Sequence, residues 1–159
     1  MPDLPGRPRI RRMARFYDLD RANARIPELR EILELLRDQR AELIRLRDLV
    51  LERQAAVEAT PEPAMAAPGR GADDDEPDDE LRLIRLRMQG LIDQMQAGVA
   101  RIDALGITLR DIESGLIDFP ALASGRQIWL CWRLGEDDVE FWHEVSAGFS
   151  DRRPIIELV

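Results

Sequence analysis

Residues 29–50 read "LREILELLRDQRAELIRLRDLV", and apolar and charged side chains are interspersed throughout this run. Its seven-residue repeat continues beyond the run, and the repeated apolar positions are Leu29, Leu36, Leu43, Val50 and Val57. Because this spacing places them on one helical face, it predicts a long helix over about 27–58. Polar Gln39 and Arg53 interrupt the second apolar position of the repeat, so the face resembles a coiled-coil seam without being a strict one.

The residues before this helix, "FYDLDRANARIPELR" at 16–30, carry start signals for a helix. Asp18 or Asp20 can accept hydrogen bonds from the free backbone N–H groups of a first turn. Pro27 suits the first turn of a helix and not its interior. We therefore expect a short helical turn at 19–25, a break or bend, and then the long helix, together forming a segment over 13–58.

A second helix is predicted over 81–106, beginning at about residue 79. Its first repeated positions are Leu81, Met88, Met95 and Ile102. Its second repeated positions are Ile84, Leu91, Gly98 and Leu105. Gly98 would admit a close neighbour, and Gly106 is a natural stop. We expect the two helices to form an antiparallel, coiled-coil-like hairpin that associates as a homodimer in a four-helix arrangement, because a lone hairpin leaves much apolar surface uncovered.

Two segments read as disordered. Residues 59–80 contain four prolines, two glycines and the acidic run "DDDEPDDE" at 73–80, and this composition is typical of a linker. Residues 1–12 hold three prolines and four arginines, which predicts a basic tail. An alternative reading makes Met13 the true start of the protein. The net charge is −8, and −8 + 7 = −1 without the seven carboxylates of the acidic run, so the acidity is local.

The overall composition narrows the classes of function. The chain is 45% hydrophobic and 34% charged, which is typical of a folded domain. All 23 basic residues are arginine, so chemistry that needs a lysine is excluded. The single cysteine and the absence of a long apolar run or signal-peptide pattern predict a cytoplasmic protein with no membrane partner. The near-neutral remainder argues against a nucleic-acid partner, and the missing phosphate-loop and metal-cluster motifs predict no cofactor.

Residues 107–159 change from helical to strand-like patterning. Short β-rich runs, separated by glycine and proline, predict strands near 107–112, 116–119, 126–134 and 139–145. The last two flank "GEDD" at 135–138, the composition of a four-residue hairpin loop. The predicted fold is therefore α+β, a long two-helix hairpin followed by a small antiparallel sheet packed on it in one domain.

The hairpin register decides how the only cysteine and the only histidine relate. If Leu134 faces Val139 across the "GEDD" loop, apolar residues pair with apolar ones and Arg133 meets Glu140. Side chains alternate between faces, so this register places Cys131 and His143 on opposite faces. They would then share neither a metal ion nor a catalytic pair, and we expect no metal site here. A β-bulge near Gly135 is the alternative that would change this parity.

Three segments resemble a known bacterial family: "GLIDFP" at 115–120, "GRQIWLCWRLGEDDVEFWHE" at 125–144 and "GFSDRRP" at 148–154. This family is catalogued as domain of unknown function 2203, and the resemblance extends over about 13–154. The family has no established activity to carry over. Its opening tends to have glutamate where this chain has Arg21, which leaves the helix cap to Asp18.

Four polar residues in the resembling segments are not what a purely structural sheet requires: Asp118, Glu136, His143 and Arg153. If they converge, they form a polar pocket with a positive charge for an anion and groups for proton transfer. We favour a small non-enzymatic interaction or regulatory protein, because the helical hairpin dominates the chain and offers surface for a protein partner. The alternative is a small-ligand or anion binder, or a hydrolase-type enzyme, that uses these four residues.

Overall fold

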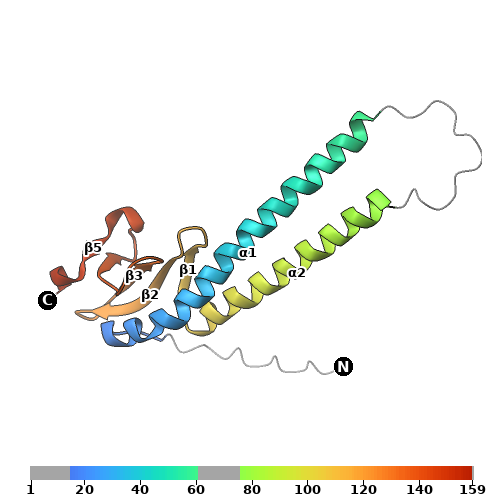
Figure 1. The fold of residues 1–159 in the computed structure, drawn as a ribbon. Coiled ribbons are helices and arrows are strands. Elements are labelled where there is room, and N and C mark those ends of the chain that lie inside the picture. Colours follow the sequence, from blue (N-terminus) through green and yellow to red (C-terminus); the bar gives the residue numbers. More distant parts are fainter. Residues whose placement is uncertain (1–14, 61–75, 159) are drawn as a thin grey trace, which may run out of the picture.

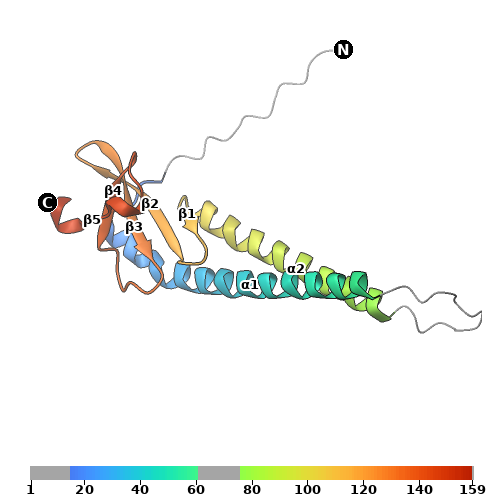
Figure 2. The same cartoon turned by 90° about the horizontal axis from the view of Figure 1, so that it is seen from above.

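A computed structural model describes residues 15–60 and 76–158 of the chain, without the side chains of 76–78. Two long helices lie side by side and form an arm that extends away from a five-stranded antiparallel sheet (Figure 1). The view from above shows the same separation of arm and sheet (Figure 2). The predicted α+β fold is confirmed. The predicted basic tail, the question of Met13 and most of the predicted acidic linker lie outside the described residues.

Helix α1 spans Leu19–Ala59, and its start is the predicted one. The side chain of Asp18 accepts a hydrogen bond of 2.8 Å from the backbone N–H of Arg21, which caps the first turn. The expected break before Pro27 is wrong, because the helix runs through it without interruption. Burial of Ala22, Ile26 and Leu29 on both sides of the proline stabilises the helix enough to offset its missing N–H.

Helix α2 spans Glu76–Ala104 and packs antiparallel to α1 (Figure 1). It begins inside the segment predicted as an acidic linker, so the predicted start was too late. Ion pairs between the helices join Arg87 to Glu42 at 2.9 Å and Arg53 to Glu80. Gly98 faces Leu36, where an added Cβ would lie 3.0 Å from the leucine side chain, so the predicted close approach at this glycine is confirmed.

The five strands follow one another in the sheet in chain order, and each pairs antiparallel with the next. Their bounds are β1 Thr108–Asp111, β2 Leu116–Ala123, β3 Arg126–Arg133, β4 Phe141–Glu144 and β5 Arg153–Pro154. Short 3₁₀ helices at Phe149–Asp151 and Ile155–Leu158 flank β5. Strand β2 is longer than predicted and β4 is shorter, and β5 was not predicted. Ser124 and Gly125, both at positive φ, make the tight turn that extends the β2–β3 hairpin.

The core lies between one face of the sheet and the first half of α1. Ile117, Phe119, Ile128, Leu130 and Trp132 alternate along β2 and β3 and are buried against helix residues. Tyr17, just before α1, joins three elements: its N–H donates to Pro120 O at 2.7 Å, and its hydroxyl donates to Leu105 O at 2.5 Å. Among the described residues, no helix has the length and apolarity that crossing a bilayer would require.

The predicted register of the β3–β4 hairpin is wrong by one residue. Cys131 pairs with Phe141 and Trp129 with His143, whereas the prediction paired Trp132 with Phe141. The connection between the strands is wider than a four-residue loop, because Val139 is held from outside the hairpin. Its backbone N–H donates to the side-chain oxygen of Asn23 in α1 at 2.8 Å. The shift puts Cys131 and His143 on the same face of the sheet, whereas the predicted register put them on opposite faces. The two residues can therefore share a site.

Candidate functional site

Three side chains meet on the sheet face that is turned away from α1. Asp118 of β2 lies opposite Cys131 of β3, and His143 of β4 lies on the same face as both. Asp118 is 2% exposed, His143 is 3% exposed and Cys131 is fully buried. One oxygen, one sulfur and one nitrogen of these residues lie within 4.8 Å of one another. This cluster brings together three kinds of group that bind metal ions or move protons.

Arg110 of β1 closes one side of the cluster. Its Nε donates to Oδ2 of Asp118 at 2.7 Å, and its guanidinium stacks over the Trp129 ring at 5.1 Å. The register of β1 against β2 shifts between Leu109 and Asp111, so Arg110 lies at a β-bulge. A bulge inserts a residue into one strand and can redirect its side chain, which accounts for the placement of this arginine over the acid.

The two ring nitrogens of His143 have different partners. Nδ1 lies 2.9 Å from the backbone oxygen of Glu144, and Nε2 lies 3.0 Å from Oδ2 of Asp118. A carbonyl oxygen only accepts hydrogen bonds, so Nδ1 carries a proton and donates it. In the neutral ring Nε2 then holds a lone pair that faces a carboxylate oxygen. The two acceptors are compatible at this distance only if a positive species, either a proton or a cation, lies between them.

The other carboxylate oxygen of Asp118 has no such contact. Oδ1 is buried and has no hydrogen-bond partner among the described residues. Most buried polar atoms in folded proteins are satisfied, so an unpaired carboxylate oxygen is a costly exception. Arg110 and His143 both contact Oδ2, and Oδ1 therefore remains available to a ligand.

Cys131 is poorly suited to nucleophilic chemistry in this environment. Burial raises the pKa of its thiol to about 12, and the nearby Asp118 carboxylate adds to the rise while Arg152 opposes it. Thiolates rather than thiols attack electrophiles, so this cysteine is protonated and inert at neutral pH unless another positive group reaches it.

A pocket of about 210 Å³ opens onto the cluster. It is lined by Arg110, Leu116, Asp118, Cys131, His143 and Phe149, together with the loop residues Val145, Ala147 and Gly148. The polar floor and the surrounding apolar walls give it the character of a small-molecule or ion site.

The four residues expected to form a polar pocket separate into different places. Asp118 and His143 are adjacent in the pocket. Glu136 instead accepts two hydrogen bonds from Arg152, at 2.7 and 2.8 Å, and one from the backbone N–H of Arg133. Arg153 stacks over Trp142 at 5.5 Å and is opposite it in the β4–β5 pairing. Glu136 and Arg153 are therefore not among the pocket-lining residues.

Arg110 was missed by the sequence reasoning, and Arg152 was not among the four residues of the predicted pocket. Arg152 lies between the Phe141 and Phe149 rings, at 4.2 and 4.9 Å, and packs behind the cluster against the backbone of Cys131. Neither arginine differs in the sequence from the other arginines of this arginine-rich chain. The alternation of β1 could have indicated Arg110, because Thr108 and Arg110 share a face in a regular strand, but the bulge and the pairing with β2 were not predictable.

One of the comparisons with known proteins gives a match. A family model described as "Uncharacterized conserved protein (DUF2203)" matches residues 15–155, which include both helices and all five strands. No curated protein and no solved structure matches the chain. Since the match covers most of the sequence, the chain belongs to the DUF2203 family of uncharacterized conserved proteins.

Proposed function

We propose that the protein is a non-enzymatic interaction protein whose two-helix arm binds helices of a second copy of the chain. The observation that carries this proposal is an apolar groove of about 370 Å³ along the arm. Its apolar lining comes from both helices and from the connection between β1 and β2: Leu43, Ile92, Met95, Val99, Ala100 and Ile112. A helix seated in such a groove would complete the burial of these mostly half-buried side chains, which contributes a part of the about 1.5–3 kcal/mol gained when a large exposed one is fully buried.

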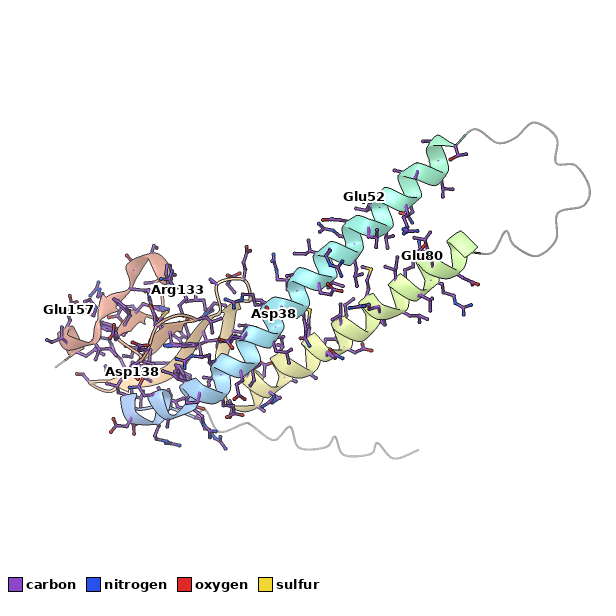
Figure 3. All side chains as sticks on the ribbon, viewed as in Figure 1. Asp38, Glu52, Glu80, Arg133, Asp138 and Glu157 are labelled. Atoms are coloured by element: carbon purple, nitrogen blue, oxygen red, sulfur yellow. The ribbon has the colours of Figure 1, made fainter. Side chains whose placement is uncertain are left out.

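The outer part of the arm lacks a buried core of its own. From residue 40 to 101, among the residues described there, only Leu46 and Leu81 are buried. Large apolar side chains on the arm are more than half exposed, namely Leu35, Leu51, Val57, Leu83 and Leu86. Figure 3 shows Glu52 and Glu80 on this outer part, away from the sheet. A second hairpin packed alongside would cover the apolar surface and leave such carboxylates at the rim of a coiled-coil-like, four-helix arrangement.

The oligomeric state of the purified chain tests this proposal. We expect light scattering to report twice the chain mass of 18.2 kDa, with dissociation on dilution. Ile92→Glu places a charge in the groove and should weaken the dimer by more than about 100-fold. Ala97→Glu is the matched control, because Ala97 is exposed on the same helix outside the groove lining, and it should remain dimeric. A wild-type particle of 18.2 kDa at high concentration would exclude self-association.

A second candidate function is binding of a small ligand or anion in the pocket on the sheet. It is favoured by the buried pair Asp118 and His143, which line an open pocket beside the Arg110 guanidinium. A thermal-shift screen with anions and nucleotides tests it, with His143→Ala as the comparison. A compound that stabilises both proteins equally does not bind at His143. A hydrolase-type activity and the cytoplasmic location both stay predictions.

A further inference from the structure

We propose that Asp118, Cys131 and His143 bind one divalent transition-metal ion of the zinc type at the floor of the pocket on the sheet. The inference rests on the second candidate function, because it takes that pocket as a binding site and names its ligand. It is independent of the helical arm.

The ligand set is the first support. Zinc binds cysteine sulfur, histidine nitrogen and carboxylate oxygen, and one of each lies here within 4.8 Å of the other two. With metal–ligand bonds of about 2.0–2.3 Å, neighbouring ligand atoms around a tetrahedral ion are about 3.3–3.8 Å apart. Nε2 of His143 and Oδ2 of Asp118 are 3.0 Å apart, close to this spacing, and the sulfur of Cys131 would have to approach them from within 4.8 Å. A thiolate together with an imidazole favours zinc over the hard cations magnesium and calcium.

The orientation of His143 is the second support. A metal-binding histidine usually donates the proton of its other ring nitrogen to a carbonyl or carboxylate, which fixes the ring and directs a lone pair at the metal. His143 has this arrangement, because Nδ1 donates to Glu144 O and the lone pair of Nε2 points at the carboxylate of Asp118. A bound cation accounts for two acceptors that face each other at 3.0 Å.

Asp118 provides the third support. Its Oδ1 is buried without a hydrogen-bond partner among the described residues, and an ion bound by both carboxylate oxygens would satisfy it. Oδ2 is held by Arg110 at 2.7 Å, which orients the carboxylate from the side of the pocket rim. The ion carries two positive charges and Arg110 carries one, whereas the Asp118 carboxylate and the Cys131 thiolate carry one negative charge each. The site therefore has a net charge of +1. Such a site attracts an anionic fourth ligand.

The geometry leaves one coordination position open. Three protein ligands and a pocket of about 210 Å³ on the open side are typical of zinc sites that keep a position for water or a small ligand. The competing explanation is an imidazolium–carboxylate ion pair of His143 and Asp118, with a proton in the place of the metal.

The sequence makes a spectroscopic test unusually clear, because the chain has one cysteine and one histidine. The full chain, prepared without a polyhistidine tag and stripped with a chelator, is titrated with Co²⁺ and then with Zn²⁺. We expect one Co²⁺ per chain, a thiolate-to-cobalt charge-transfer band in the near ultraviolet, and loss of that band when Zn²⁺ displaces the cobalt. The carboxylates of 73–80 offer only oxygen and cannot produce this band.

Substitutions then assign the ligands. Cys131→Ser should abolish the band, and Asp118→Asn should weaken Zn²⁺ binding by more than about 10-fold, whereas Asp137→Asn, an exposed carboxylate in the nearby loop, should change neither. Circular dichroism checks that each variant is folded. If a variant is not, X-ray absorption of the wild-type zinc protein decides, since it must show sulfur and imidazole in the metal shell.

Two results would overturn the metal site: Co²⁺ binding without the charge-transfer band, or an X-ray absorption spectrum with oxygen ligands only. In either case an anion from the thermal-shift screen that stabilises the wild type and not His143→Ala would show that the pocket binds a ligand but not a metal. If neither metals nor anions bind, the pocket itself is not a binding site, and the second candidate function fails as well.

Discussion

Three consecutive residues of β2 have different roles: Asp118, Phe119 and Pro120. Asp118 faces the pocket and contacts Arg110 and His143. Phe119 faces the core and meets the Tyr17 ring at 5.2 Å in an edge-on contact. The carbonyl oxygen of Pro120 accepts a hydrogen bond from the N–H of Tyr17. Pro120 lies beyond the end of the β1 pairing, so its missing N–H costs no hydrogen bond between strands. The motif "DFP" thus supplies a site, a core contact and a helix anchor.

Cys131 supports a prediction on the pH dependence of stability. Its thiol pKa is raised from 9.0 to about 12 in the folded protein, so between these values the folded state keeps a proton that the unfolded state loses. The free energy of unfolding should therefore fall as pH rises above 9, by about 1.4 kcal/mol per pH unit. Urea unfolding with a chelator present, at pH 8 to 10.5, measures this. The loss should be absent from Cys131→Ala, and equal slopes in both proteins would contradict the prediction.

The connections between the strands are held by specific hydrogen bonds and tight turns. Glu136 lies in the β3–β4 connection and makes two hydrogen bonds back to β3. Its side chain accepts one from the N–H of Arg133, and its carbonyl oxygen accepts one from Nε1 of Trp132. At the other end of β3, the turn of Ser124 and Gly125 is tight. Gly115, between β1 and β2, has φ +65° and lies against Leu134, with which it forms a backbone hydrogen bond of 3.0 Å.

Gly115→Ala should lower the stability by about 2–4 kcal/mol. An added Cβ would lie 2.5 Å from Cβ of Leu134, and positive φ is unfavourable for alanine, so both the contact and the backbone oppose the change. Gly90→Ala is the matched control, because this helical glycine has nothing within 4 Å of an added Cβ and should gain about 1 kcal/mol. Thermal and urea unfolding measure both effects. A Gly115→Ala protein as stable as the wild type would show that the turn adopts another conformation.

At the scale of the whole molecule, the first half of α1 packs against the sheet, and the same helix continues into the arm. Its inner turns are buried against β2 and β3, while its outer turns lie along α2 (Figures 1 and 2). Asn23 joins this helix to the far hairpin through the N–H of Val139, across 116 positions of sequence. The contact fixes the wide β3–β4 connection, and with it the register that brings His143 to Asp118.

Asn23→Ala should therefore lower stability by about 1–3 kcal/mol, because it leaves the N–H of buried Val139 without a partner. It should also loosen the β3–β4 connection, seen as faster amide hydrogen exchange at Val139 than in the wild type. Arg25→Ala is the control, because Arg25 lies two residues further along the same helix with a half-exposed ion pair to Glu28, and it should change stability by less than about 0.5 kcal/mol. Equal effects of the two substitutions would contradict the assigned role of Asn23.

The sequence by itself determined the two helices, the Asp18 cap, the close approach at Gly98 and the antiparallel strands, because periodicity, capping and glycine spacing act over a few residues. Only the tertiary structure decided that α1 continues through Pro27, where burial on both sides offsets the missing hydrogen bond. It also decided the β3–β4 register, because a wide loop is compatible with more than one strand pairing and the contact from Asn23 favours the observed one. That register brings Asp118, Cys131 and His143 together. The position of Arg110 depends on a β-bulge, which no local sequence pattern indicates.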